Sequence, residues 1–124
     1  MLPAAARLRH RESFIDVLRR GRRVTRGPLV FHLGTSPRLP TDRSGQASRP
    51  GPRSARIGFV ISAKVGGAVR RNRLRRRLRH LLRSRVGDLP AVDVVIRALP
   101  GAAELSVAEL DRLLDEGLRP LAVR

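Results

Sequence analysis

The sequence has no cysteine, tryptophan or tyrosine among its 124 residues, and only three phenylalanines. Without cysteine the chain can form no disulfide framework, no thiolate metal site and no cysteine nucleophile. No apolar run approaches the roughly 18 residues that a membrane-spanning helix requires. The opening stretch MLPAAARLRHR has an apolar segment too short for a secretory signal. We therefore expect a cytoplasmic protein with no membrane partner.

Acidic residues are also scarce, and their scarcity is uneven. The chain has 27 Lys and Arg residues against 10 Asp and Glu, a net charge of +17. Residues 1–86 hold 23 basic and 3 acidic residues, whereas residues 87–124 hold 4 and 7. Self-repulsion on this scale indicates a polyanionic partner, with nucleic acid as the first candidate. The length predicts one domain, 1–124, with one modest core.

The spacing of apolar residues predicts alternating helices and strands around a small sheet, an α/β sandwich. The predicted elements in chain order are a helix over 12–20 with Gly21 as its C-cap, a strand over 29–33, a strand over 56–62, a basic helix, a strand over 92–99 and a final helix. The final helix begins with a Ser106–Glu109 capping box and ends before Pro120. Its apolar stripe consists of Val107, Leu110, Leu114 and Leu118. The pattern is also compatible with a further short strand over 22–26.

The stretch TSPRLPTDRSGQASRPGPRS, residues 35–54, is dense in Pro, Gly and Ser and has no apolar period. Such a segment cannot bury enough apolar surface to offset the entropy lost on ordering. We predict a flexible loop within the single domain, not a boundary between two domains.

The stretch AKVGGAVRRNRLRRRLRHLLR, residues 63–83, carries seven arginines in the ten positions from Arg70 to Arg79. On a helical wheel of about 100° per residue its other leucines fall within about 80° of Leu74, a narrow stripe that can dock on a sheet. These leucines are Leu74, Leu78, Leu81 and Leu82. The opposite side carries Asn72, Arg76, Arg79 and Arg83, with Arg73 and His80 beside them.

Guanidinium groups repeated at about 5.4 Å per helical turn can pair with successive phosphates in bidentate fashion. Gly66 and Gly67, next to Lys64, would let a phosphate approach the start of this helix. A solvated charged face that binds nothing is the alternative, but residues 63–86 contain no acid to balance the charge. The pattern therefore favours contact with a nucleic-acid backbone.

The sequence VGGAVRRNRLRRRLR, residues 65–79, closely resembles the signature of the bacterial ribonuclease P protein subunit. The matching positions are Ala68, the triplet 71–73 (Arg-Asn-Arg), Leu74 and the basic run that follows. The resemblance extends to Phe14 and Leu18 ahead of a glycine, to IGFVISAKVG, and to the terminal amphipathic helix. It covers nearly the whole chain except residues 35–54.

This resemblance implies a ribosomal protein S5 domain 2-like fold, an α/β (α+β) two-layer sandwich in the order αβ(β)βαβα. The basic helix would lie in a left-handed crossover between parallel strands. Such proteins bind the catalytic RNA of ribonuclease P and help it recruit Mg²⁺, which the RNA mainly holds. They also contact the 5′ leader of precursor tRNA in a cleft between the sheet and the first helix, while the RNA performs the hydrolysis.

The residue assignments follow by position. Contacts with the catalytic RNA are expected from Lys64, Arg70, Arg71, Asn72, Arg73, Arg75 and Arg76, and, from the outward face of the helix, from Arg79 and Arg83. The leader cleft is expected near Phe14, Leu18, Phe31 and His32.

The sequence departs from the family pattern at four positions. Ala63 stands where a basic residue is usual, Gly67 where asparagine is common, and Leu18 and His32 where aromatic residues are frequent. With three phenylalanines in all, base stacking on a broad aromatic platform is weak, so the leader contacts are less firmly predicted than those of the basic helix.

Three alternatives compete with this interpretation. A ribosomal or ribosome-assembly protein would have the same charge and size. A DNA-recognition helix usually belongs to an all-helical fold, so the strands argue against a DNA partner. Catalysis by the chain itself is disfavoured because its three histidines lie far apart and show no metal-ligand spacing.

The acids Asp111, Asp115 and Glu116 are expected on a solvated helix face. We predict no catalytic residue, no metal site and a monomer apart from RNA.

Overall fold

The computed structural model describes residues 7–8, 11–34, 55–90 and 92–121. Its main elements are α1 (Arg11–Arg20), β1 (Arg22–Arg26), β2 (Leu29–Leu33), β3 (Arg56–Ile61), α2 (Ala68–Leu82), β4 (Asp93–Ala98) and α3 (Val107–Leu118), with short 3₁₀ turns that include η2 (Ala63–Val65), η3 (Val86–Asp88) and η4 (Ala102–Glu104). The predicted order is confirmed, and the further strand over 22–26 is present. The predicted loop 35–54 lies outside the described residues. No helix among the described residues is long and apolar enough to cross a membrane.

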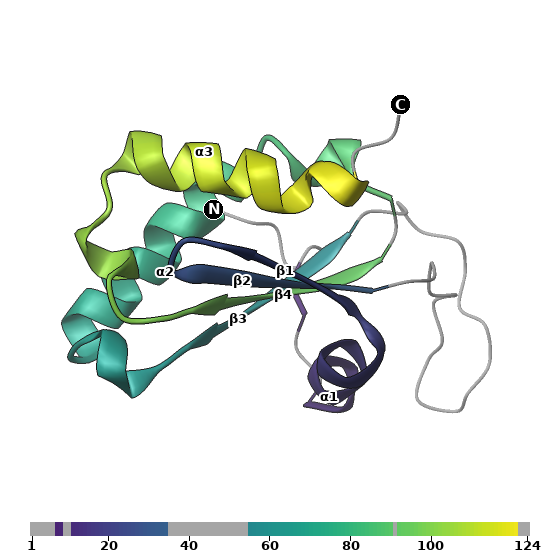
Figure 1. The fold of residues 1–124 in the computed structure, drawn as a ribbon, viewed down its shortest axis with the longest axis horizontal. Coiled ribbons are helices and arrows are strands. Elements are labelled where there is room, and N and C mark those ends of the chain that lie inside the picture. The colour runs from purple at the N-terminus through teal and green to yellow at the C-terminus, as the bar shows by residue number, and fades with distance from the viewer. Residues whose placement is uncertain (1–6, 9–10, 35–54, 91, 122–124) are drawn as a thin grey trace.

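The four strands form one sheet in the order β1-β2-β4-β3 (Figure 1). Strands β1, β2 and β4 pair antiparallel, and β3 pairs parallel with β4. Because a parallel pair needs a long crossover, helix α2 lies in the connection between β3 and β4. The parallel pair around the basic helix agrees with the family resemblance, and the hand of the crossover stays a prediction.

Helices α2 and α3 cover one face of the sheet (Figure 1). The main core lies between them and the strands and includes Leu29, Phe31, Ile57, Val94, Ile96, Leu110 and Leu114. Helix α2 contributes Leu74, Leu78 and Leu82, here called the leucine seam, each at most 1% exposed. Fully burying one leucine contributes about 1.5–3 kcal/mol. The predicted docking stripe is therefore confirmed at three positions, with Leu81 half-buried at its margin.

Helix α3 starts and packs nearly as expected. The Ser106 hydroxyl accepts a hydrogen bond from the Glu109 N–H (3.1 Å), and the Ser106 N–H donates to the Glu109 carboxylate (3.0 Å), which confirms the capping box. These bonds lower the pKa of Glu109. Val107 was predicted in the apolar stripe but is 50% exposed, because it occupies the first helical turn beyond the edge of the core. Leu113 is buried instead.

Helix α1 packs on the opposite face of the sheet, below one of its ends (Figure 1). Its Val17 and Phe14 join Leu8 and Val95 in a second, smaller cluster. A Cβ on Gly58 would lie 2.2 Å from Cζ of Phe14, so this glycine lets the ring approach strand β3. Helix α1 thus adds a partial third layer to the predicted two-layer sandwich.

Candidate nucleic-acid interface

The segment that leads into α2 is a tight turn followed by an open helix start. The Ser62 hydroxyl accepts a hydrogen bond from the Lys64 N–H (3.2 Å) at the beginning of η2. Gly67 is the N-cap of α2, and no side chain caps the helix there. A Cβ on Gly67 would meet nothing within 4 Å. The start of α2 is therefore uncapped and open at Gly67, where an anion can approach the first N–H groups of the helix.

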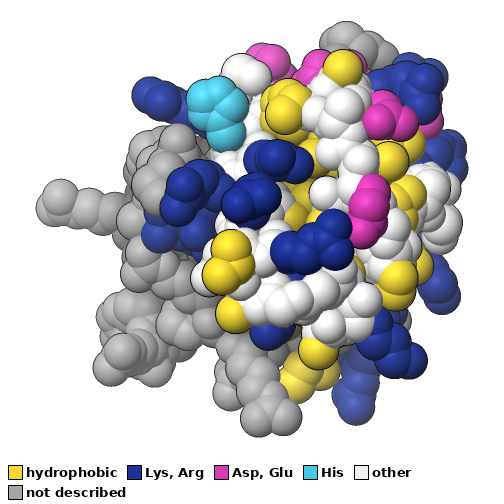
Figure 2. Space-filling view, turned by 90° about the vertical axis from the view of Figure 1, so that its left-hand side faces the viewer, with side chains coloured by type: hydrophobic (Ala, Val, Ile, Leu, Met, Phe, Trp, Pro, Cys, Tyr) yellow, Lys and Arg dark blue, Asp and Glu magenta, His cyan; other side chains and the backbone are white. Residues whose placement is uncertain are grey.

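The outward side of α2 is basic along its length. Lys64, Arg70, Asn72, Arg73, Arg76 and Arg83 are exposed, as predicted. Among the described residues, neither Arg73 nor Arg76 has an ion-pair partner. Figure 2 looks onto the end of the molecule formed by η2 and the start of α2, and it shows Lys and Arg side chains across this end, with most acidic ones toward the side of α3. This surface presents uncompensated positive charge.

Four of the predicted contact residues already have polar partners within the chain, namely Arg70, Arg71, Asn72 and Arg75. The Arg71 Nε donates to the Gly66 carbonyl (3.2 Å) and so steadies the turn before the helix. The Arg75 guanidinium donates to the Asn72 side chain (3.0 Å). Asn72 therefore positions its neighbour one turn along, and both remain on the basic side of the helix.

Arg70 forms an ion pair with Glu104 of η4 at 3.1 Å. Both side chains are 55% exposed, and exposed pairs of this kind contribute only about 0–1 kcal/mol. A phosphate can therefore displace Glu104 at little cost.

Arg79 does not lie where the helical wheel placed it. It is half-buried, and its guanidinium carbon lies 5.9 Å from the centre of the Phe59 ring on strand β3. Burial, followed by the charges of Arg7 and Arg75, lowers the pKa of Arg79. The prediction that Arg79 points directly away from the sheet is wrong, because its long side chain bends back over the partly buried Phe59.

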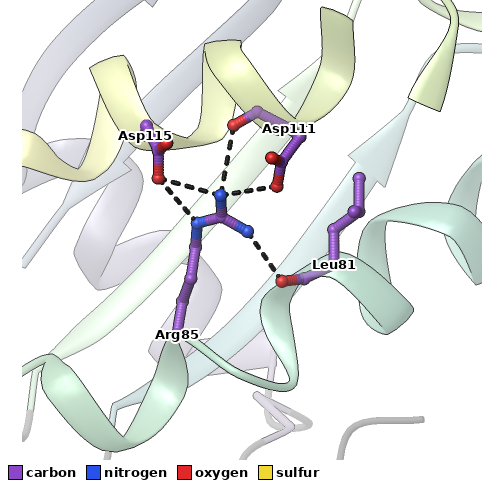
Figure 3. Close-up of polar contacts among 4 residues, drawn as sticks. All are labelled: Leu81, Arg85, Asp111 and Asp115. Atoms are coloured by element: carbon purple, nitrogen blue, oxygen red, sulfur yellow. Dashed lines mark hydrogen bonds and ion pairs between the residues drawn. The ribbon is translucent and has the colours of Figure 1, made fainter. Parts of the chain in front are cut away.

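Arg85, just beyond α2, is a structural residue that the sequence analysis did not single out. Its guanidinium bonds to the Asp111 and Asp115 carboxylates of α3 and donates to the Leu81 carbonyl at 2.8 Å (Figure 3). Burial alone would lower the pKa of Arg85, but the hydrogen bonds to the two aspartates outweigh it and raise the pKa. Arg85 thus joins the end of α2 to α3.

The expectation that the acids of α3 lie on a purely solvated face is therefore wrong for Asp111 and Asp115. No local signal could have revealed their pairing, because the partners are 26 and 30 residues apart. Glu116 makes longer contacts, at 4.0 Å, with Arg26 and Arg112.

The four predicted leader residues do not lie together. Phe14, Leu18 and His32 lie on the α1 side of the sheet, with Leu18 exposed and Phe14 half-buried. Phe31 is fully buried in the main core on the opposite side. The prediction is wrong for Phe31, because adjacent residues of a strand point to opposite faces and Phe31 and His32 cannot share one.

His32 is 6% exposed, and its Nε2 has no hydrogen-bond partner among the described residues. It lies in one cross-strand row with Arg23 of β1 and Val95 of β4. Burial, then the nearby charges of Arg97 and Arg23, lowers the pKa of His32. Burial and the two arginines thus favour the neutral form of the histidine.

The next cross-strand row on this face was missed by the sequence analysis. It runs Thr25, Val30, Arg97 and Val60 from β1 to β3. Val60 is 38% exposed and Arg97 half-buried, and on α1 the neighbouring Ile15 is 42% exposed. Arg97, a charged residue in an otherwise apolar strand, is the signal that could have placed this row, because strand alternation puts it on the same side as Val95.

Within the described part of the chain, no group of His, Asp or Glu side chains could hold a metal ion. His32 is buried on the α1 side of the sheet, whereas His80 is exposed on α2. His10 lies outside the described residues.

Comparison with known proteins gives consistent matches along the chain. A family model described as Ribonuclease P matches residues 2–122. The ribonuclease P protein component of Streptomyces avermitilis is 49% identical over 125 residues, 98% of this chain and 95% of the relative. That of Acidothermus cellulolyticus is 49% identical over 119 residues, 92% of this chain and 89% of the relative.

Two solved structures share the fold. The RNase P protein of Staphylococcus aureus superposes with a TM-score of 0.72 at 19% identity, covering 93% of this chain and 94% of that one. The RNase P protein of Thermotoga maritima has a TM-score of 0.68 at 23% identity, with the same coverage of both chains. At these identities the likeness concerns the fold alone.

We expect Arg85→Met to lower the free energy of unfolding by about 1–3 kcal/mol, because it removes hydrogen bonds to two carboxylates and a carbonyl. Urea denaturation followed by circular dichroism measures the loss. The matched variant Arg76→Met removes an arginine with no ion-pair partner among the described residues and is expected to stay within about 0.5 kcal/mol of the wild type. Equal losses in the two variants would contradict the distinction between structural and outward arginines.

Proposed function

Because this chain belongs to the ribonuclease P protein family, we propose that it acts as the subunit that binds the enzyme's RNA and substrate while that RNA performs the chemistry. Ribonuclease P proteins take part in processing the 5′ leader of tRNA, and this chain is the protein component of such an endoribonuclease. The observation that supports the binding role best is the acid-free outward side of α2. Nothing in the comparisons supports the ribosomal alternative.

The catalytic RNA would bind along the outward side of α2. Lys64 and the open start of the helix would receive one phosphate, and Arg73 and Arg76, three positions apart, would pair with the next phosphates along a strand. The leucine seam keeps the backbone of α2 fixed against the sheet, so little backbone conformational entropy is lost on binding. Counter-ion release from about six phosphates would give a log–log salt slope of about −4 to −5.

The 5′ leader would bind on the other side of the sheet, beside α1. Exposed Leu18, Ile15 and Val60 offer apolar contacts there, and Arg23 and Arg97 offer two positive charges next to His32. Because no aromatic platform is present, phosphate contacts would carry more of the affinity than base stacking. A bound phosphate would also favour the protonated form of His32.

Hydrolysis itself would be the work of the RNA and its Mg²⁺. The described part of the chain has no group of three or more His, Asp or Glu side chains that could hold a metal ion. The protein would assist by neutralising phosphates that otherwise repel one another where the RNA folds around Mg²⁺. Less Mg²⁺ would then be needed to reach the active RNA structure.

Reversing two outward charges tests the RNA interface. We expect Arg73→Glu with Arg76→Glu to weaken binding to a bacterial ribonuclease P RNA at least about 100-fold and to make the salt slope less steep by about two or more. Filter binding at several salt concentrations measures both quantities. The circular dichroism spectrum is expected to stay that of the wild type, because neither arginine has a partner among the described residues.

The matched control is Arg112→Glu with Arg119→Glu on the α3 side, which changes the net charge by the same amount. It is expected to weaken binding only slightly. Equal loss in both double variants would show that net charge alone governs binding. Loss of helix content in the first variant would show that its arginines support the fold instead.

The leader site is tested by Arg97→Gln. We expect the reconstituted enzyme to bind a precursor tRNA with a leader about 3–10-fold more weakly, as for loss of one charge-assisted contact, and to bind mature tRNA unchanged. The matched control is Arg22→Gln, a strand arginine on the opposite face of the sheet, which is expected to change neither affinity. An equal loss for precursor and mature tRNA would contradict a role in leader binding.

A further inference from the structure

The ion pair between Arg70 and Glu104 joins the basic helix to a segment 34 residues away. Arg70 lies in the first turn of α2, and its guanidinium donates a hydrogen bond to the Glu104 carboxylate at 3.1 Å. Residues 63–86 contain no acid, so a carboxylate can reach this part of α2 only from another element. Glu104 therefore brings a negative charge to the surface where the RNA is proposed to bind.

The backbone around Glu104 is fixed by its neighbours. Gly101 has a φ of +102°, in the left-handed region that glycine favours, and it is the N-cap of η4. Ala102 is fully buried, and Leu105 packs against the main core. The Glu104 N–H donates to the Gly101 carbonyl at 3.3 Å. The Glu104 side chain itself is 55% exposed, so this segment holds a solvated carboxylate beside Arg70.

The stem of Arg70 is confined by the turn before α2. A Cβ on Gly66 would lie 3.2 Å from Cβ and 2.9 Å from Cδ of Arg70, so the glycine makes room for this stem. The Gly66 carbonyl also accepts the hydrogen bond from Arg71. The Arg70 side chain is nevertheless 55% exposed and meets Glu104 at the surface. A phosphate, which guanidinium groups bind in bidentate fashion, can replace a carboxylate held in this way.

We propose that Glu104 competes with RNA phosphate for Arg70 and so lowers the affinity of the protein for RNA. A phosphate that binds Arg70 displaces the Glu104 carboxylate and then lies near its negative charge. The displaced carboxylate takes up a cation from solution, which cancels about one of the cations that the RNA releases. On a chain with a net charge of +17, which attracts any polyanion, such an acid limits how tightly RNA is retained. This inference rests on the RNA-binding role proposed above and adds a residue that weakens binding.

A double-mutant cycle tests the competition, with filter binding of a bacterial ribonuclease P RNA at several salt concentrations and full-length variants checked for native circular dichroism spectra. We expect Glu104→Gln to tighten binding about 2–5-fold and to make the salt slope steeper by about one. In the Arg70→Gln background the same change is expected to tighten binding less than about 1.5-fold, because the cation for which Glu104 competes is gone and the remaining repulsion is screened. The matched control Glu116→Gln removes an acid about 13 Å beyond the start of α3 and is expected to change neither quantity.

Two results of the cycle would overturn the competition. Weaker binding by Glu104→Gln would show that the acid positions Arg70 for the RNA. An equal gain in both backgrounds, or an equal gain from Glu116→Gln, would show that net charge alone explains the effect.

A second arm repeats the cycle with poly-uridylate, an RNA with no relation to ribonuclease P, and the same gain from Glu104→Gln is expected there. If the wild type prefers the ribonuclease P RNA but Glu104→Gln changes binding of neither RNA, the competition is overturned and the proposed function stands. If the wild type shows no such preference but the cycle with poly-uridylate gives the expected gains, the competition stands and the proposed function fails.

Discussion

The leucine seam of α2, formed by Leu74, Leu78 and Leu82, fixes a helix that electrostatics alone would disfavour. Like charges four residues apart on a helix cost about 0.2–0.5 kcal/mol per pair, and no acid lies within residues 63–86 to offset them. Burial of the three leucines contributes about 1.5–3 kcal/mol each, which outweighs that repulsion. The helix therefore owes its stability to packing on the sheet, and its arginines are presented from a fixed backbone.

The arginines themselves divide into groups that composition cannot distinguish. Arg73 and Arg76 face outward and have no ion-pair partner among the described residues. Arg85 ties the end of α2 to two aspartates of α3, and Arg56 makes two hydrogen bonds, at 2.9 and 3.0 Å, to the buried Asp93 at the start of β4. Among the described residues, the positive charge that lacks an acidic partner thus lies mainly on the outward side of α2. The paired arginines hold together the elements that position this helix.

The helices and strands could be predicted because a single local sequence pattern is enough to identify each of them. The seam residues follow the helical period, Ser106 and Glu109 carry a capping signature, and the strands are apolar runs of ordinary length. Contacts between distant segments were not predictable: Arg85 meets acids 26 and 30 residues away, and Arg79 bends toward Phe59. The error at Phe31 was avoidable, since strand alternation already separates it from His32.

The central claim, that this chain binds and assists a catalytic RNA without cutting RNA itself, is tested most directly by reconstitution. Cleavage of a precursor tRNA would be followed at about a few millimolar Mg²⁺, where screening of RNA phosphates is limited, with a bacterial ribonuclease P RNA, with the protein, and with both. The account predicts cleavage at the mature 5′ end only when both are present. Cleavage by the protein alone, or no gain when it is added to the RNA, would contradict it.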